Sequence, residues 1–183
     1  MKRIVVLGTS GSGKTTLAKE LARRLGLSHI ELDALHWNAN WVSTPAEELR
    51  RRISRAMEAA PHGWSVCGNY RVANEQIWQQ ADTIIWLDYP MSIVMYRVTR
   101  RTLSRAWFRT RLWNGNRERL WVQLFSRDSL LLWVINTWRK RRRDYPKELA
   151  QLRDRGIRVF RFRYPRQTDA WLNTVTLPAV ARD

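Results

Sequence analysis

Residues 8–15 read GTSGSGKT, and the segments on either side of them differ in character. The preceding run RIVVLG (3–8) is short, apolar and rich in β-branched residues, which is typical of a buried strand. In the following segment TLAKELARRL (16–25), leucines recur at every fourth position from Leu17 to Leu25, the spacing of one helix face. The glycines are therefore expected to form a turn between a strand and a helix.

This turn has the pattern G-x-x-x-x-G-K-[ST] of a phosphate-binding P-loop. Glycines let backbone N–H groups curl around phosphate oxygens, and the start of the next helix adds a positive dipole end. Lys14 is expected to reach the β- and γ-phosphates, and the Thr15 hydroxyl to bind Mg²⁺. The sequence therefore predicts binding of ATP or GTP with Mg²⁺. The residues predicted to hold the nucleotide are Gly8, Thr9, Ser10, Gly11, Ser12, Gly13, Lys14, Thr15 and Thr16.

Strand-like runs alternate with helical patterns along the rest of the chain, which favours a βαβ architecture with one parallel sheet. The runs are RIVVLG (3–8), HIEL (29–32), WSVCG (64–68), TIIWLD (83–88) and IRVFRF (157–162). Helical periodicity resumes at about Ser126, and Pro146 is expected to begin a further helix. No linker or repeat interrupts the pattern, so residues 1–183 are predicted to form a single domain.

The composition limits the class of protein. The chain has 33 basic and 16 acidic residues and a net charge of +17, which attracts polyanions such as nucleoside triphosphates, nucleic acid or anionic lipid. Cys67 is the only cysteine, so an internal disulfide is excluded and a reducing cytoplasm is expected. No apolar run approaches the roughly 20 residues that span a bilayer. A cytoplasmic protein without a membrane span is predicted, and the sequence does not indicate its oligomeric state.

Polar residues follow three of the predicted strands. Asp33 comes just after the second strand, Asn69 and Arg71 follow the third, and Asp88 follows the fourth. Because open α/β sheets bind ligands at the carboxyl ends of their strands, these side chains are candidates for a site shared with the P-loop.

Four further segments carry a resemblance to a known family. HIELDALHWNANW (29–41), WSVCGNYR (64–71), ADTIIWLDYP (81–90) and LWNGNRERL (112–120) follow the P-loop in this order. The set resembles the bacterial adenylate-kinase-like proteins often labelled topology modulation proteins. The resemblance implies the fold of nucleoside monophosphate kinases and shikimate kinase. That fold is an α/β P-loop NTPase with a five-stranded parallel sheet in the order 2-3-1-4-5, flanking helices and an Arg-rich helical lid, here at about residues 105–125.

Cys67 stands where many relatives carry an aspartate. A thiol is a poor ligand for Mg²⁺, which prefers oxygen. Asp33 and Asp88 are then the carboxylates left to contact Mg²⁺ through water or to accept a proton from an acceptor hydroxyl. Asp33 is favoured for catalysis, and Thr15, Asp33 and Asp88 are the predicted metal residues. A helix cap is the alternative role for either aspartate.

The acceptor pocket and the lid supply the remaining candidates. Arg71 resembles the arginine that holds the acceptor's phosphate in nucleotide kinases, although it could be a surface residue. Lid arginines would neutralise charge on the transferring phosphoryl group. Trp113 is a further candidate for the pocket wall. The predicted acceptor residues are Asp33, Trp37, Trp41, Gly68, Asn69 and Arg71, and the predicted catalytic residues are Lys14, Asp33, Arg117 and Arg119.

These features favour a P-loop kinase that moves the γ-phosphoryl group of ATP to a small acceptor. A nucleoside monophosphate kinase is the alternative within the same class. A nucleotide-gated DNA-binding protein is the alternative from another class, in which RKRRR (139–143) and the lid arginines contact phosphates.

Overall fold

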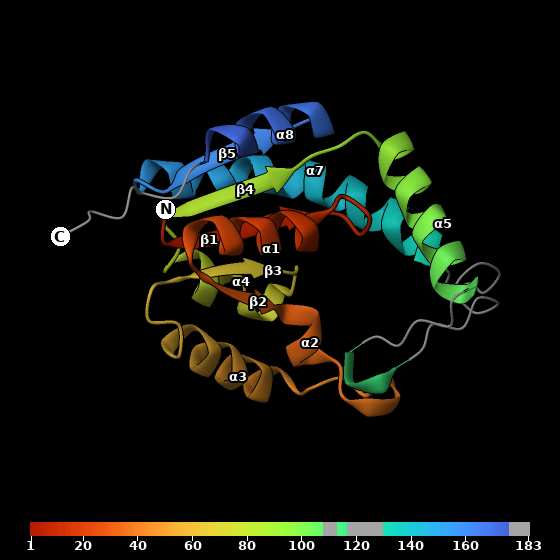
Figure 1. The fold of residues 1–183 in the computed structure, drawn as a ribbon, viewed down its shortest axis with the longest axis horizontal. Helices are drawn as coiled ribbons and strands as arrows, with labels where there is room; N and C mark the ends of the chain where they lie inside the picture. The colour runs from red at the N-terminus through yellow and green to blue at the C-terminus, as the bar shows by residue number, and fades with distance from the viewer. Residues whose placement is uncertain (108–112, 117–129, 176–183) are drawn as a thin grey trace.

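A computed structural model describes residues 1–107, 113–116 and 130–175. Its centre is a five-stranded parallel sheet in the order β2-β3-β1-β4-β5, which confirms the order that the sequence resemblance implied (Figure 1). The strands are β1 (Arg3–Gly8), β2 (Ser28–Glu31), β3 (Trp64–Cys67), β4 (Thr83–Leu87) and β5 (Arg158–Phe162). This is the fold of P-loop NTPases.

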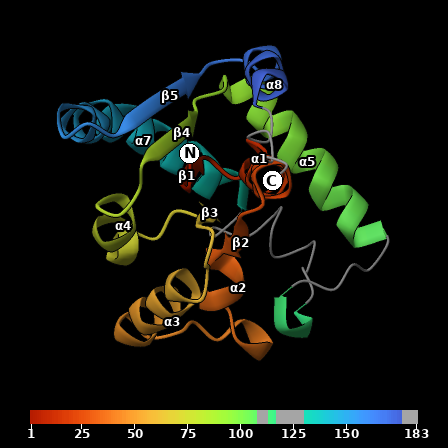
Figure 2. The ribbon, with the colours of Figure 1, turned by 60° about the vertical axis from the view of Figure 1, so that its left-hand side comes forward.

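Helices cover both faces of the sheet. They are α1 (Lys14–Leu25), α2 (Leu32–His36), α3 (Ala46–Glu58), α4 (Arg71–Trp78), α5 (Met91–Trp107), α7 (Leu130–Asp154) and α8 (Pro165–Thr174), with short 3₁₀ turns η1 (Ala39–Trp41) and η2 (Trp113–Gly115). Figure 2 shows α3 and α4 on one side of the sheet and α1, α5 and α8 on the other. The predicted lid falls mostly outside the described residues, which include only the end of α5 and Trp113–Asn116 of that range.

Two hydrophobic clusters lie on the two faces, and β1 feeds both. Val5 and Leu7 belong to the cluster under α3 and α4, whereas Ile4 and Val6 belong to the cluster under α1 and α5. A parallel strand with helices on both faces is buried on both, which explains why RIVVLG is apolar throughout rather than alternating. The same argument accounts for β4, in which every residue is buried.

The helix α7 runs without interruption through Pro146, so the expectation that a new helix begins there is wrong. Tyr145, the residue before the proline, is buried and packs edge-on against Trp78 and Trp86. A proline inside a helix removes a backbone hydrogen bond. Packing of Tyr145 and of Leu149 one turn later holds the two halves of the helix on the same core cluster.

The sheet register brings the segments with functional candidates to one edge. Gly8 at the end of β1 lies opposite Leu87 of β4, and Cys67 at the end of β3 lies opposite Val6 of β1 and Glu31 of β2. The chain leaves all these strands at their carboxyl ends, as expected for parallel strands. The P-loop and the residues that follow β2, β3 and β4 therefore start from the same edge.

Candidate active site

The P-loop adopts a conformation that glycine permits and other residues do not. Gly11 has a φ of 83°, and a Cβ there would overlap the side chain of Val98 on α5. The Ser12 amide donates to the Thr9 carbonyl at 3.0 Å and so closes the turn. The Ser12 hydroxyl oxygen is buried and has no hydrogen-bond partner. A buried hydroxyl without a partner is rare in folded proteins and needs an explanation.

Basic side chains surround this loop. Lys14 Nζ donates to the Thr9 carbonyl at 3.1 Å, and two residues of α5 hold the loop from outside. Arg97 Nη1 donates to the Ser12 carbonyl at 3.2 Å, and Arg101 Nη2 donates to Ser10 Oγ at 3.0 Å. Burial lowers the pKa of Lys14 to about 8, and the nearby Arg141 guanidinium adds to this effect. An anion in the cradle would relieve this concentration of positive charge.

A carboxylate that sequence reasoning missed lies beside Thr15. The Thr15 hydroxyl donates to Glu31 Oε1 at 3.2 Å, and the Cys67 sulfur lies 3.7 Å from the same hydroxyl oxygen. Burial raises the pKa of the Cys67 thiol to about 11, which keeps it neutral. Glu31 and Cys67 are paired at the ends of neighbouring strands, so Glu31 supplies an oxygen where Cys67 cannot. The signal available in the sequence was a carboxylate near the carboxyl end of the strand-like run HIEL (29–32), two positions before Asp33.

Asp33 lies in the first turn of α2 and accepts a hydrogen bond from the Tyr70 hydroxyl at 2.6 Å. Burial raises the pKa of Tyr70, and the Asp33 carboxylate adds to the shift, so the phenol retains its proton. Asn69 donates to the Gly8 carbonyl at 2.6 Å and thereby ties the end of β3 to the start of the P-loop. The residue at the N-cap of α2 is Glu31, so Asp33 does not have the capping role considered as its alternative.

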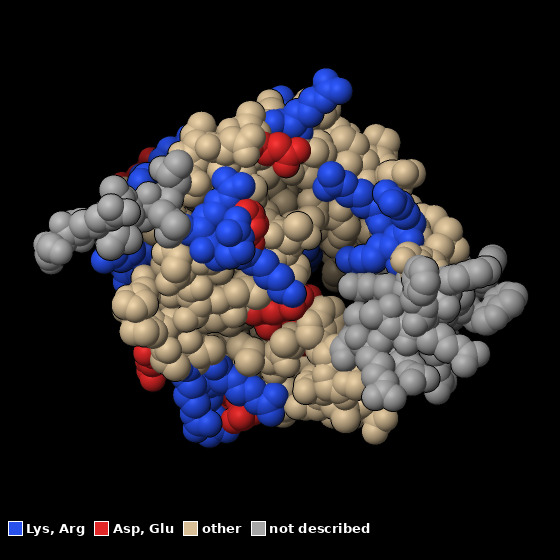
Figure 3. Space-filling model, viewed as in Figure 1, with Lys and Arg blue, Asp and Glu red and all other residues tan. Residues whose placement is uncertain are grey.

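One cavity of about 920 Å³ joins these groups. Figure 3 shows a hollow on this face, with basic side chains gathered over α5 on one side. Among the predicted site residues, the cavity brings together Ser10, Gly11, Gly13, Lys14, Thr15, Thr16, Asp33, Trp37, Trp41, Gly68 and Asn69. The cavity is also lined by residues that are not among the predicted site residues, namely Lys19, Glu31, Tyr70, Trp133 and Arg141. Trp113, the further candidate for the pocket wall, lines it as well, together with Arg97 and Arg101 of α5.

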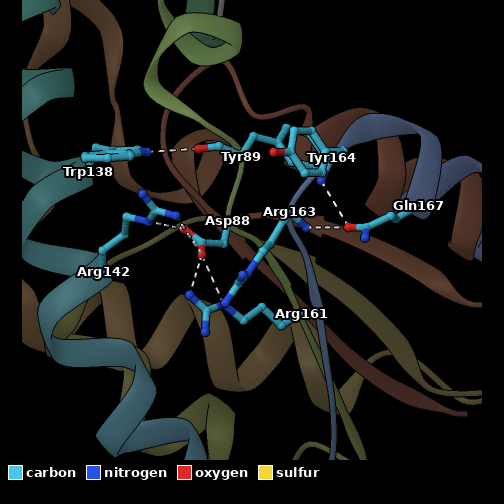
Figure 4. A network of polar contacts seen from close by, with 8 residues as sticks. All are labelled: Asp88, Tyr89, Trp138, Arg142, Arg161, Arg163, Tyr164 and Gln167. Atoms are coloured by element: carbon cyan, nitrogen blue, oxygen red, sulfur yellow. Dashed lines mark hydrogen bonds and ion pairs between the residues drawn. The ribbon is translucent and has the colours of Figure 1, made fainter.

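Five described residues of the prediction do not line the cavity: Gly8, Thr9 and Ser12 are part of the P-loop itself, whereas Arg71 and Asp88 lie elsewhere. Arg71 at the start of α4 is exposed and does not line the cavity. Asp88 is buried, and its two oxygens are held by Arg142 at 2.8 Å and Arg161 at 2.6 Å, so it is not placed with Thr15 and Asp33 (Figure 4). The predicted catalytic residues Arg117 and Arg119 lie outside the described residues.

The basic run at 139–143, considered for nucleic acid, is partly engaged within the protein, whereas Arg139, Lys140 and Arg143 are exposed. Arg142 pairs with Asp88 and Arg143 with Asp144, while Arg141 lines the cavity. The Nη1 atom of Arg141 is buried without a hydrogen-bond partner. Arg141 follows Val134 by seven positions and so falls on the buried stripe of α7. An arginine at an apolar position of a helical stripe was the signal that could have identified it.

Across the described residues, no helix is both long and apolar enough to cross a membrane. The same part of the chain contains no group of three or more His, Cys, Asp or Glu side chains that could hold a metal ion without further ligands. A Mg²⁺ site of the P-loop type does not need such a group, because one hydroxyl, one or two carboxylates, phosphates and water suffice.

The chain is similar to several known kinases. The chain is 28% identical over 110 residues to the shikimate kinase of Ruegeria pomeroyi, covering 53% of this chain and 56% of the relative. It is 32% identical over 110 residues to the cytidylate kinase of Pyrococcus horikoshii, covering 54% of this chain and 56% of the relative. The matches thus span about half the length of these curated relatives.

A solved structure of a sugar kinase from Janibacter sp. HTCC2649 superposes with a TM-score of 0.55 at 18% identity, covering 96% of this chain and 94% of that one. At this identity the likeness concerns the fold. The comparisons support the resemblance to kinase-like P-loop proteins, whereas the finer resemblance to topology modulation proteins stays a prediction. Residues 4–106, more than half of the chain, match the family described as AAA domain. This chain therefore belongs to the AAA domain family of P-loop proteins.

Proposed function

We propose that this protein is a kinase that transfers the γ-phosphoryl group of ATP, with Mg²⁺, to the hydroxyl of a small acceptor. The observation that carries the proposal is the shared cavity. It places Lys14 and Thr15 of the phosphate cradle beside the carboxylates of Glu31 and Asp33. Positive charge for phosphates and a base for an alcohol are the two requirements of phosphoryl transfer.

The donor end is supported by groups that have no partner in the protein. The Ser12 hydroxyl and Nη1 of Arg141 are both buried and unpaired, and both lie at the P-loop end of the molecule. Lys14 and Arg141 are close enough for their charges to interact unfavourably. Triphosphate oxygens would satisfy these donors and compensate the repulsion.

The residues around Thr15 fit Mg²⁺. Hard oxygen ligands are present in the Thr15 hydroxyl and the Glu31 carboxylate, which lie 3.2 Å apart. We assign the metal contact to these two residues, with Asp33 in reach of the same cavity, and not to Asp88, whose oxygens are held by arginines. Mg²⁺ supplies charge neutralisation between the β- and γ-phosphates when bound.

Asp33 is the candidate general base. The acceptor oxygen forms a bond to the γ-phosphorus, the bond from that phosphorus to the β,γ-bridging oxygen breaks, and ADP leaves. The proton of the acceptor hydroxyl passes to Asp33. The Tyr70 hydrogen bond fixes Asp33 Oδ1, which leaves Oδ2 for the acceptor. Lys14 and Arg141 stabilise the charge that develops on the phosphoryl oxygens.

The relatives support kinase chemistry but differ in acceptor, since their names specify shikimate and cytidylate. A nucleoside monophosphate acceptor has less support from the structure, because Arg71, the predicted phosphate ligand, is exposed and outside the cavity.

Turnover of ATP in the presence of a panel of alcohols tests the proposal. Lys14→Ala is expected to abolish transfer and Asp33→Asn to slow it by about 10²- to 10⁴-fold with ATP binding retained. Lys147→Ala, at an exposed position of α7, is the matched control and should behave as the wild type. Transfer that persists at the wild-type rate in Lys14→Ala would refute the proposal.

A further inference from the structure

Three tryptophans form the wall of the cavity opposite the P-loop. The rings of Trp37 and Trp41 have centroids 5.5 Å apart at 78°, and those of Trp41 and Trp113 have centroids 6.5 Å apart at 81°. All three line the cavity that contains Asp33. Consecutive rings thus stand nearly at right angles. We call the three rings together the tryptophan corner.

The corner is built from two segments far apart in the sequence. Figure 1 shows η2 lying against the loop that follows α2. The Asn116 side chain joins them, because its Oδ1 accepts from the Trp41 amide at 2.9 Å and its Nδ2 donates to the Asn38 carbonyl at 2.8 Å and the Trp113 carbonyl at 2.9 Å. Asn116 is buried, and its two amide hydrogens and its oxygen are all used. Asn114 adds a hydrogen bond to the Trp37 carbonyl.

The backbone at Trp41 is strained. Its φ of 58° places a bulky residue in the left-handed region, next to Asn40 at 60°. Such a conformation is unfavourable for a residue other than glycine and persists where surrounding structure enforces it. Here the hydrogen bond from the Trp41 amide to Asn116 enforces it. The strain serves the orientation of the Trp41 ring in the corner.

Charge is unevenly distributed around the cavity. Its basic lining residues all belong to α1, α5 and α7, and they are Lys14, Lys19, Arg97, Arg101 and Arg141. In the described residues, the segments on the corner side contribute Glu31, Asp33, aromatic rings, Gly68 and Asn69, and no lysine or arginine. Among the described residues, an anionic acceptor would therefore find acidic and aromatic neighbours on that side and no cation.

From this arrangement we infer that the acceptor is an uncharged alcohol with a flat ring, of which a nucleoside is an example. The ring stacks in the tryptophan corner and the hydroxyl reaches Asp33. Stacking on aromatic side chains tolerates different bases and contributes substantially to binding. Asn116 acts as a positioning residue, since it orients Trp41 and Trp113 without facing the acceptor. The inference rests on the proposed kinase function and specifies its substrate class.

Matched pairs of acceptors test this directly. Purified full-length protein is supplied with ATP and Mg²⁺ and with nucleosides, their 5′-monophosphates, phenyl glycosides, shikimate and gluconate. We expect kcat/KM for at least one flat neutral alcohol to exceed that of its anionic counterpart by at least about tenfold. Nucleosides and phenyl glycosides share the inferred chemistry, and their relative rates distinguish the two sources. Calorimetric titration of the same compounds reports binding without catalysis.

Variants locate the effect. Trp113→Ala is expected to raise the KM for the acceptor about tenfold with the KM for ATP unchanged, and Trp113→Phe to retain most of the affinity. Asn116→Ala should also raise the acceptor KM with kcat and the KM for ATP nearly unchanged, a split that general loss of folding would not produce. Val42→Ala is the control, because Val42 lies in the same loop, is 58% exposed and does not line the cavity.

The possible outcomes separate the inference from the proposed function. Transfer that depends on Lys14 but prefers monophosphates, shikimate or gluconate would overturn the inference and leave the kinase assignment intact. Lack of transfer to every compound would count against the kinase assignment. Failure of every flat neutral alcohol to bind in the calorimeter would overturn the inference irrespective of turnover.

Discussion

The surroundings of Lys14 alter its protonation. Burial and Arg141 lower its pKa to about 8, so its charge changes close to physiological pH. A bound triphosphate favours the protonated ammonium, and binding above that pKa must therefore take up a proton. ATP affinity is expected to be full below about pH 8 and to fall as pH rises through the pKa of the free protein.

This gives a prediction of pH dependence. Calorimetric or fluorescence titration should show ATP binding weakened by roughly tenfold between about pH 8 and about pH 9.5, since about one proton is taken up in this range. Lys14→Arg is the control, because a guanidinium stays protonated and its affinity should be level across the range. A wild-type affinity that does not vary with pH would show that Lys14 is not the titrating contact.

Glu31 is predicted to govern the requirement for Mg²⁺. Its carboxylate accepts a hydrogen bond from the Thr15 hydroxyl. It can supply the oxygen ligand for Mg²⁺ that the Cys67 thiol beside the same hydroxyl cannot. Glu31→Gln is expected to raise the Mg²⁺ concentration for half-maximal turnover by about 10- to 100-fold. The exposed Glu47→Gln on α3 should leave it unchanged. If both variants have the wild-type Mg²⁺ dependence, the metal contact lies elsewhere.

At the scale of elements, the position of α7 depends on the end of β4. Trp138 Nε1 donates to the Tyr89 carbonyl at 2.9 Å, and Arg142 pairs with Asp88, as Figure 4 shows. Arg142 also lies over the Trp138 ring, with its guanidinium carbon 4.5 Å from the ring centroid. Two adjacent contacts thus fix the rotation of the helix. That rotation directs the side chain of the preceding residue, Arg141, into the cavity.

Asp88→Asn is expected to destabilise the protein, because it leaves Arg142 and Arg161 facing each other without a counter-charge. Breaking a fully buried pair costs about 3–5 kcal/mol. The two arginine side chains are 37% and 36% exposed, so water compensates part of the loss and about 1–3 kcal/mol is expected. Urea denaturation measures the change.

Removal of the excess charge tests the cause of that loss. The double variant Asp88→Asn/Arg161→Met should recover part of the stability, since one guanidinium no longer faces another. If Asp88→Asn alone lowers the free energy of unfolding by less than about 0.5 kcal/mol, the ion pairs of Asp88 do not hold α7 in place.

At the scale of the whole molecule, part of the positive charge lines the cavity or forms ion pairs within the fold. Some of the basic side chains line the cavity. Others form ion pairs, such as Arg142 with Asp88 and Arg24 with Glu20. Repulsion among the basic side chains that line the cavity is expected to limit the stability of the free protein. Binding of a polyanion that bridges α1, α5 and α7 should relieve it.

ATP with Mg²⁺ is therefore predicted to stabilise the whole fold. At a ligand concentration of 100 times Kd, the gain is about 2.7 kcal/mol, which corresponds to roughly 5–10 °C in Tm for a chain of this size. Differential scanning calorimetry measures the shift, and Lys14→Ala should show much less of it. An unchanged Tm at saturating ATP would contradict nucleotide binding in this cavity.

The features that could be read from the sequence are those set by neighbours in the chain. The P-loop at Gly8–Thr15 follows from backbone sterics at glycine and from the strand and helix periodicities on either side. Asp33 and Asn69 were found because strand ends in a parallel sheet meet at one edge. The order of the strands was inferred from the resemblance and agrees with the structure.

Tertiary structure alone decided which distant side chains meet. Glu31 contacts Thr15 through the pairing of β2 with β3, Asp88 is taken by Arg142 and Arg161, and Arg141 enters the cavity through the rotation of α7. The bond from Asn116 to Trp41 joins residues 75 positions apart. Local patterns report the period of an element and which of its faces is buried. They do not report strand register or the rotation of a helix about its axis, and these two quantities determine the partners of a side chain.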